Sequence, residues 1–306
     1  MNKKMLLGFS ISLLAFVVSA FSPMPAAQSP AVEVVKSVDI PKPGEPDQPD
    51  RTLEDANSSL KASEKRTLTG DNFIKDVFER PFTSIKMDYL PDTDILTASI
   101  FTDANYHYFT IQLAGLNKAD YILSATYGIE FDLNKDGRGD FLVTAMNPTK
   151  DWSIVDVKVY SDPNGDVGGP IPIWADSRFI GKGDGYEKIL DNVNSAFARL
   201  DPNNETAIQI AVSRQLLGDP KEFLWGAWAD NGLRNPQKLD YNDMFKLSDA
   251  GSPIKSDPNY PVKAIFALDN TCRVPYGFET IKNIPGMCIK AAPDKPAPKP
   301  GKGTPG

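Results

Sequence analysis

The feature that most constrains the fold is an oxygen-rich loop between two apolar runs in residues 127–143, YGIEFDLNKDGRGDFLV. Before the loop, the apolar side chains of Ile129, Phe131 and Leu133 alternate with glycine and acidic residues. This period of two is typical of a half-buried β-strand, and a second apolar run follows the loop at 141–145. Two such runs joined by a short polar loop with glycine predict a β-hairpin.

The chemistry of this loop indicates a calcium site. Calcium takes about six to eight oxygen ligands, and side chains at alternate positions of a tight loop can turn toward one ion. The expected ligands are the side chains of Asp132, Asn134, Asp136 and Asp140 and the backbone carbonyl of Arg138. Gly137 permits the sharp turn. Val143 stands where a helical EF-hand has a bidentate glutamate, so the missing ligand would come from elsewhere. The alternative interpretation is a polar hairpin turn without an ion.

A second acidic loop follows at 162–169, DPNGDVGG. Its alternate oxygen-bearing residues are Asp162, Asn164 and Asp166, which could bind a second calcium ion or complete the first site. The alternative is an ordinary turn between strands, because aspartate, asparagine and glycine are also the usual turn residues.

Short strand-like runs separated by turn residues recur through the chain. They lie at 95–101, 106–113, 121–133, 141–145, 155–160, 171–174, 197–200, 207–213, 223–228 and 262–268. Many short strands with turns between them predict an all-β fold, an antiparallel β-sandwich of the jelly-roll or immunoglobulin-like kind. We place this domain at 67–290, after a disordered linker at 21–66 and before a disordered Pro/Lys/Gly tail at 291–306.

The N-terminus has the pattern of a secretory signal peptide at 1–20. Two lysines precede a short apolar run at 5–18 and small residues follow it, so we expect cleavage after Ala20, with Ala27 as the second choice. A membrane anchor is the alternative, but a span needs about 20 apolar residues. We therefore expect a secreted or extracellular protein, with the periplasm and the cell surface as the other exported locations.

Charge and cysteine content agree with export. The formal net charge is -7 at pH 7, which disfavours binding to nucleic acid or to anionic membranes. The two cysteines, Cys272 and Cys288, form an even pair, which in an exported chain predicts a disulfide. A zinc or redox pair is the alternative, but the chain has no Cys-x-x-Cys and a single histidine, His107.

Two segments carry a resemblance to a known family. Residues 96–113, LTASIFTDANYHYFTIQL, form a strand pair, and 206–230, TAIQIAVSRQLLGDPKEFLWGAWAD, read as strand, short turn and strand. Together they resemble the β-sandwich of family-nine carbohydrate-binding modules and the related DOMON-like domains, over roughly 92–230 of the chain. The resemblance implies a structural calcium ion and a glycan ligand. It departs from the haem-binding members, because no axial Met and His pair can be assigned.

Sugar-binding members of that family hold their ligand between tryptophans, and Trp225 and Trp228 are the candidates for stacking here. They fall on opposite faces of one predicted strand, so we expect at least one of them in the core. Core packing is the alternative for the other.

The residues favour a binding protein over an enzyme. We expect a secreted, calcium-stabilised, non-catalytic module whose partner is an extracellular glycan or another cell-surface component. One alternative is a glycoside hydrolase with a carboxylate pair such as Asp240 and Asp243, or Asp92 and Asp94. Another is a purely structural protein of the cell envelope. His107 lies at the apolar phase of its strand, which favours a packing role.

Overall fold

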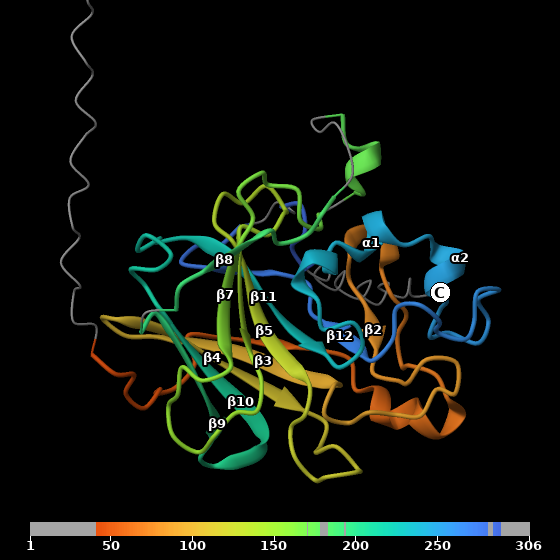
Figure 1. Cartoon of the computed structure of the whole chain (residues 1–306), viewed down its shortest axis with the longest axis horizontal. Coiled ribbons are helices and arrows are strands. Elements are labelled where there is room, and N and C mark those ends of the chain that lie inside the picture. The colour runs from red at the N-terminus through yellow and green to blue at the C-terminus, as the bar shows by residue number, and fades with distance from the viewer. Residues whose placement is uncertain (1–40, 170, 178–182, 193, 281–283, 289–306) are drawn as a thin grey trace, which may run out of the picture. The chain divides into compact units, whose positions relative to one another are not determined.

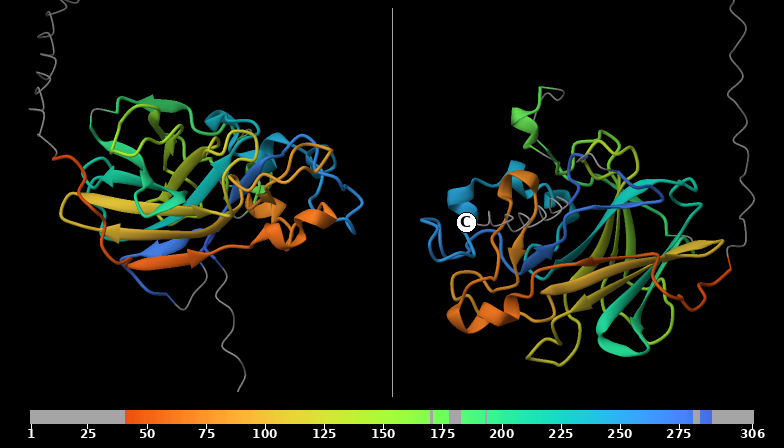
Figure 2. Two further views of the ribbon diagram at one scale, coloured as in Figure 1. Left: turned by 90° about the horizontal axis from the view of Figure 1, so that it is seen from below. Right: turned by 180° about the vertical axis from the view of Figure 1, so that it is seen from behind.

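Two antiparallel β-sheets form the body of the protein and enclose one large apolar core (Figures 1 and 2). The structure is a computed structural model that describes residues 41–169, 171–177, 183–192, 194–280 and 284–288. The predicted signal peptide at 1–20, the first part of the predicted linker and the predicted tail at 291–306 lie outside the described residues.

The first sheet has the strand order β1-β3-β4-β10-β9, and every neighbouring pair is antiparallel. Its strands are β1 (Arg51–Glu54), β3 (Ile95–Thr102), β4 (Tyr106–Leu113), β10 (Asn204–Ser213) and β9 (Ala196–Asp201).

The second sheet has the order β2-β12-β11-β5-β6-β7-β8, and β13 pairs with one end of β11. Its strands are β2 (Glu79–Arg80), β12 (Leu268–Asn270), β11 (Phe223–Asp230), β5 (Thr126–Asp132), β6 (Phe141–Ala145), β7 (Val157–Ser161), β8 (Lys188–Leu190) and β13 (Val274–Tyr276).

The helices of the described residues are short and lie outside the sheets (Figure 1). They are η1 (Ser58–Glu64), η2 (Phe73–Lys75), η3 (Ile173–Ala175), η4 (Pro236–Lys238), α1 (Tyr241–Met244) and α2 (Leu247–Ala250).

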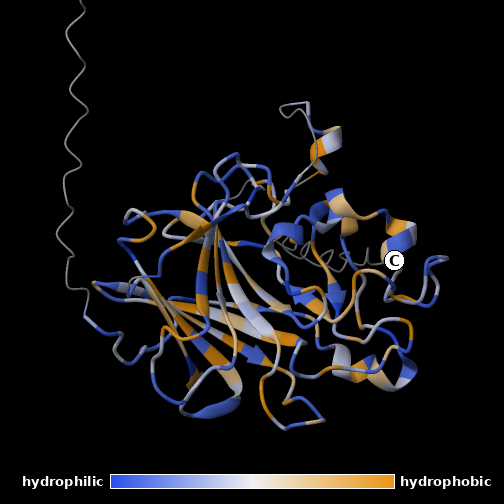
Figure 3. Ribbon diagram, viewed as in Figure 1, coloured by the Kyte–Doolittle hydropathy of each residue, from blue (hydrophilic) through white to orange (hydrophobic). Residues whose placement is uncertain are grey.

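The core lies between the sheets because apolar residues alternate along the strands (Figure 3). Phe109 of β4 contacts Phe131 of β5 and Trp225 of β11, with ring centroids 5.4 and 5.1 Å apart. These contacts join the two sheets, and aromatic pairs of this kind add about 0.5–1.5 kcal/mol beyond their buried area. The predicted antiparallel β-sandwich is therefore confirmed.

The predicted hairpin is also confirmed, since β5 pairs with β6 from Tyr127↔Ala145 to Phe131↔Phe141. Two strand predictions were wrong. Residues 171–174 overlap the helix η3, and the strand expected at 262–268 begins only at Leu268. Both segments are apolar but short, and periodicity alone does not distinguish a short strand from a buried turn.

The folded part of the chain begins earlier than predicted, because the assignment of 41–66 to a disordered linker was wrong. β1 pairs with β3 from Arg51↔Ile100 to Glu54↔Thr97, and η1 follows it. Leu53 packs against the main core from this edge strand. A strand of four residues with one apolar side chain is too weak a pattern to stand out within a Pro-rich and Asp-rich segment.

The predicted disulfide between Cys272 and Cys288 is confirmed, with the two Cα atoms 5.0 Å apart. It closes a loop that starts after β12, contains β13 and returns to residues 284–288. A disulfide is consistent with an oxidising extracellular or periplasmic compartment. Within the described residues, no helix has the length and apolar character that crossing a membrane requires.

Candidate functional site

Three carboxylates from distant parts of the chain form a buried acidic triad of Asp55, Glu79 and Asp269. Glu79 of β2 and Asp269 of β12 are direct partners in an antiparallel pair, so their side chains share one face of the sheet. Asp55 follows β1, and its amide nitrogen donates to the carbonyl of Leu96 at 2.9 Å. One oxygen from each carboxylate lies within 4.8 Å of the others, and no other group of acids, histidines or cysteines in the described chain meets that criterion.

Burial makes the negative charge of this triad costly. Burial is the main cause that raises the pKa of Asp55 to about 7 and that of Glu79 to about 9. It also raises the pKa of Asp269 well above its ordinary value, and the charges of Glu79 and Asp55 add to that rise. Among the described residues, none of the three carboxylates forms an ion pair with a basic side chain.

Hydrogen bonds satisfy only part of the triad. Asp269 Oδ2 accepts from the amide of Ile95 at 2.6 Å, and Glu79 Oε1 accepts from the hydroxyl of Ser58 at 2.5 Å. Asp55 Oδ1 accepts from the amide of Ala56 at 2.8 Å. Asp269 Oδ1 and Asp55 Oδ2 are buried without a hydrogen-bond partner. Unpaired buried carboxylate oxygens are strongly unfavourable unless a cation or a proton compensates them.

A fourth carboxylate lies beside the triad. Asp94 raises the pKa of Asp55, Glu79 and Asp269 through its charge. It accepts hydrogen bonds from the hydroxyl of Tyr89 and from the amide of Ser59, the latter at 3.1 Å. The donor set of this region is therefore hard carboxylate oxygen, which suits calcium, magnesium or manganese.

Sequence reasoning missed the triad because its members lie far apart in the chain. Asp55 fell inside the predicted linker, and Glu79 and Asp269 lie in strands of two and three residues. The only local signal was an acidic residue in each short segment, which is common in a chain with 40 acidic residues. The pairing of β2 with β12 is what brings two of them together.

The predicted calcium loop is closed by its own amide groups. Asp132 is completely buried, and its two oxygens accept from the amides of Lys135 at 2.6 Å and Gly137 at 2.8 Å. Asp140 Oδ2 accepts from the amide of Leu133 at 2.6 Å. Burial is the main cause that raises the pKa of Asp132 to about 6 and also raises that of Asp140.

The remaining loop residues also lie where the hairpin was expected. Asn134 donates from Nδ2 to Asp140 at 3.1 Å, and Asp136 accepts from the amide of Arg138 at 2.9 Å. The structure thus brings all the predicted side chains into one loop. The three loop carboxylates do not approach one another as closely as those of the triad.

The Arg138 side chain has a role that the sequence did not indicate. Its guanidinium is buried and donates to the carbonyls of Asp166 at 3.1 Å and Ile171 at 3.2 Å. It also forms an ion pair with Asp176 at 3.2 Å. The guanidinium therefore anchors the segment that contains the second acidic loop to the first one.

The second acidic loop lies beside the first. The amide of Asp162 donates to the carbonyl of Asp140 at 3.0 Å, and that of Gly139 donates to Val167 at 3.0 Å. Asp162 accepts from the amides of Gly165 and Val167 at 3.0 and 2.9 Å, as in an ordinary turn. Burial, followed by the charge of Asp162, raises the pKa of Asp166 to about 7.

Asn164 lies at the exposed end of this loop, where its side-chain amide is 3.5 Å from Asp184. The buried Oδ1 of Asp166 has no hydrogen-bond partner. These contacts place the second loop within reach of the first.

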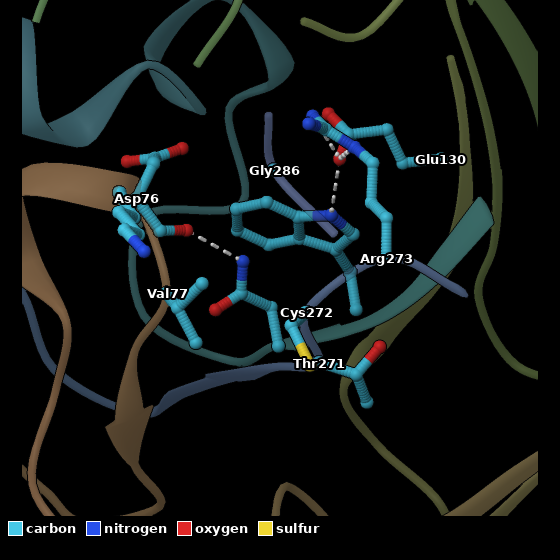
Figure 4. A pocket seen from close by; sticks show the side chains of 10 residues that line it. Asp76, Val77, Glu130, Thr271, Cys272, Arg273 and Gly286 are labelled. Carbon is cyan, nitrogen blue, oxygen red and sulfur yellow. Dashed lines mark hydrogen bonds and ion pairs between the residues drawn. The ribbon is translucent and has the colours of Figure 1, made fainter. Parts of the chain in front are cut away.

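The two tryptophans proposed to stack on a sugar have no open ring face. Trp225 is completely buried in the core between the sheets, as expected for at least one of the two, so its ring is closed to a sugar. Trp228 points to the opposite face, as predicted, but it is only 4% exposed and packs against Tyr241. Its indole nitrogen donates to Glu130 at 3.4 Å (Figure 4).

The pocket beside Trp228 is too small for a sugar. Figure 4 shows Asp76, Glu130 and Arg273 around it, and its volume is about 10 Å³. That is the space of roughly one water molecule. Arg273 donates to Glu130 from Nε at 3.0 Å and from Nη2 at 2.7 Å, so a buried ion pair lines the pocket.

The proposed catalytic carboxylates hold loops in place. Asp240 is completely buried, and its Oδ1 accepts from the amide of Gly168 at 3.2 Å. Burial is the main cause that raises its pKa to about 10, and the charges of Asp76 and Asp243 add to this. Asp243 accepts from the amide of Ile173 at 2.8 Å. Asp92, which like Asp94 is buried, accepts from the hydroxyl of Ser124 at 2.8 Å.

His107 occupies a packed position, as predicted. Its ring packs edge-on against those of Phe223 and Tyr276, with centroids 5.1 and 5.2 Å away. Its Nδ1 is 2.8 Å from the hydroxyl of Thr102. Burial is the main cause that lowers its pKa to about 4.

No protein-family model, curated protein or solved structure matches this chain. The resemblance to family-nine carbohydrate-binding modules and DOMON-like domains therefore stays a prediction. The site itself is defined by geometry, as a buried set of carboxylates in a β-sandwich.

Proposed function

We propose that this protein is an exported, non-catalytic binding module whose β-sandwich is stabilised by a calcium ion at the triad Asp55, Glu79 and Asp269. The observation that carries the proposal is the pair of buried, unpartnered oxygens on Asp269 and Asp55. A divalent cation between them would replace mutual repulsion by attraction and supply the missing partners. Calcium is the expected ion because it accepts irregular sets of carboxylate and carbonyl oxygens and is abundant outside the cell.

The position of the triad explains why the ion would stabilise the fold. Asp55 belongs to the chain that leaves the first sheet, whereas Glu79 and Asp269 belong to the second sheet. One ion bound to all three would therefore join the two sheets at one edge. A ligand that binds only the folded state at about 100 times its dissociation constant adds about 2.7 kcal/mol to the free energy of unfolding.

The test is a thermal melt of chelator-treated protein with calcium or magnesium added back, together with the metal content per chain. We expect calcium to raise the melting temperature by a few degrees. Asp269→Asn should reduce the shift strongly, because it removes the charge of a completely buried ligand. The matched control is Asp151→Asn at an exposed position, which should leave the shift unchanged. Equal melts of the wild type with and without calcium would refute the proposal.

The partner class of the module is an extracellular glycan or another cell-surface component, as the resemblance implies. Because neither Trp225 nor Trp228 is open, the ligand surface would lie elsewhere on the module. Glycan arrays and pull-downs on insoluble polysaccharides, with calcium present, test this part. Consistent absence of binding in both would remove the carbohydrate ligand and leave the metal proposal standing.

A further inference from the structure

The outer face of the first sheet carries an aromatic platform made of Tyr106, Tyr108, Trp152 and Phe197. Tyr106 and Tyr108 alternate on β4 with His107 and Phe109, whose side chains point to the other face. Ring centroids are 5.8 Å apart for Tyr106 and Tyr108, and 5.9 Å apart for Tyr108 and Trp152. Aromatic side chains on an outer sheet face are unusual unless something covers them.

A proline-rich segment, residues 41–46 with the sequence PKPGEP, covers this platform. The side chain of Pro43 is buried, whereas those of Pro41 and Lys42 are exposed. The hydroxyl of Tyr106 donates to the carbonyl of Pro41 at 2.6 Å.

Both peptide groups of Gly44 are also bound by the platform. Its amide donates to the hydroxyl of Tyr108 at 3.0 Å, and its carbonyl accepts from the indole nitrogen of Trp152 at 3.0 Å. The polar groups of three aromatic side chains thus bind the backbone of a segment whose Pro43 is buried. This is how aromatic surfaces recognise extended proline-rich peptides.

Arg199, beside the platform, binds Glu45, the residue that follows Gly44. Arg199 is buried, lies 4.3 Å from the ring of Trp152, and donates to Gln209 at 2.7 Å. Its two terminal nitrogens donate to the carboxylate of Glu45 at 2.7 and 2.5 Å. Because two bonds fix the guanidinium to one carboxylate, this contact selects an acidic residue after the glycine.

The same tetrapeptide occurs a second time in the chain. Pro41-Lys42-Pro43-Gly44 is repeated as Pro298-Lys299-Pro300-Gly301, and Lys302 then stands where the first copy has Glu45. The described chain ends at Cys288, and Pro298 follows ten residues later. Ten extended residues reach about 33 Å, which is long enough to extend to a neighbouring molecule.

We propose that the platform is a binding site for Pro-Lys-Pro-Gly segments and that its second occupant is the 298–301 segment of another copy of this chain. The resident segment, 41–46, occupies the platform in the single molecule and competes with the incoming one. The resident segment is favoured because it is covalently attached to the platform's own chain. Glu45 also forms an ion pair with Arg199, whereas Lys302 at the same position of the incoming segment is repelled by Arg199. Exchange would join one copy to the next head to tail, which gives a closed ring or an open chain of copies.

The test uses the full-length chain and a fluorescent peptide of residues 293–306. The double variant Pro43→Ala, Glu45→Lys weakens the resident segment, and it should bind the peptide at least about tenfold more tightly than the wild type. Adding Trp152→Ala should cost about tenfold in affinity, because the ring and its hydrogen bond are lost. Trp174→Ala removes a tryptophan that is 71% exposed on η3, so it serves as the matched control and should have no effect.

Charge provides a second, independent readout. A peptide with Lys302→Glu should bind several-fold more tightly than the natural peptide, and Arg199→Gln in the chain should abolish that gain. Sedimentation of the double variant should show association that grows with concentration and is lost when Pro300→Ala is added. Peptide binding that is insensitive to Trp152, no binding by a folded double variant, or a monomer at every concentration would each overturn the proposal.

Discussion

Arg273 and Glu130, which are 143 positions apart, form a buried ion pair with two hydrogen bonds, from Nε at 3.0 Å and from Nη2 at 2.7 Å. The same guanidinium donates from Nη1 to the carbonyl of Gly137 at 2.6 Å. Glu130 also accepts from the hydroxyl of Tyr186 at 2.7 Å. One arginine next to the disulfide therefore connects β5, the predicted calcium loop and the C-terminal segment. Figure 4 shows the pairing of Arg273 with Glu130.

Arg273→Met should destabilise the protein by about 3–5 kcal/mol, because it leaves the Glu130 carboxylate buried without its counter-charge. The double variant Arg273→Met, Glu130→Gln should be less destabilised than the sum of the single variants. Urea unfolding at fixed pH measures these differences. The exposed substitution Lys150→Met is the control and should change the free energy of unfolding by less than about 0.5 kcal/mol. Strictly additive effects of the two single substitutions would contradict a coupled pair.

His107 should make the fold sensitive to acid. Its folded-state pKa of about 4 lies below the ordinary value of 6.5. The imidazole is therefore protonated below about pH 6.5 in the unfolded chain but only below about pH 4 in the folded chain. Because the unfolded state binds the extra proton, the free energy of unfolding falls as the pH drops from 6.5 to 4. Each unit of pKa difference corresponds to about 1.4 kcal/mol. His107→Gln should remove this contribution.

The measurement is the free energy of unfolding of wild type and His107→Gln at several values between pH 4 and 7. The difference between them should change with pH, with the variant gaining relative to the wild type as the solution becomes more acidic. A difference that stays constant across the range would show that the ring is protonated equally in both states.

Local patterns predicted the parts of the fold that depend on neighbouring residues. The alternation in 106–113 and 223–228 gave correct strands, and the polar loop after Asp132 gave the correct hairpin. The tertiary partners of 41–55 could not be predicted in this way. Glu45 is paired with Arg199 and Asp55 approaches Asp269, and no pattern within a proline-rich segment indicates such distant contacts.

The two tryptophans of β11 also show that local patterns do not predict tertiary contacts. Alternation correctly assigned Trp225 and Trp228 to opposite faces of β11. It could not predict that Tyr241, at the start of α1, would cover the outer one. Burial of the outer face is a property of the connections between strands, which vary in length and carry little periodicity.

The chelated protein should lose stability as the pH rises. The folded pKa values of about 7 for Asp55 and about 9 for Glu79 lie above the ordinary values of 3.8 and 4.5. At pH values between the ordinary and the folded-state pKa of each group, the folded chain keeps a proton that the unfolded chain has released. Rising pH therefore favours unfolding. Calcium should displace those protons and remove the penalty. The increase in melting temperature on adding calcium should therefore be larger at pH 8 than at pH 5.

Melts in chelator and in calcium at both values test this, and calorimetry in two buffers of different ionisation enthalpy counts the protons released. Glu79→Gln, which cannot ionise, should flatten the pH dependence of the chelated protein. The exposed control Asp151→Asn should keep it. A calcium effect that is larger at pH 5, or binding without proton release at pH 7, would argue against the triad as the site.

The predicted calcium loop can be separated from the triad by removing the triad first. In an Asp269→Asn background, any calcium-induced rise in melting temperature that remains should come from the loop, and Asp136→Ala should then abolish it. Asp136 raises the pKa of both Asp132 and Asp140 through its charge, so this substitution also removes repulsion within the empty loop.

Asp162→Ala distinguishes two arrangements of the acidic loops, one with separate ions and one with a shared ion. The hydrogen bond from the Asp162 amide to the Asp140 carbonyl persists in this variant, because it involves only backbone atoms. A residual rise that survives Asp162→Ala means that the two loops are separate, and one that is strongly weakened means that they share the ion. If Asp269→Asn already removes the whole effect at millimolar calcium, the loop is a turn closed by its own amides, and the triad alone binds the metal.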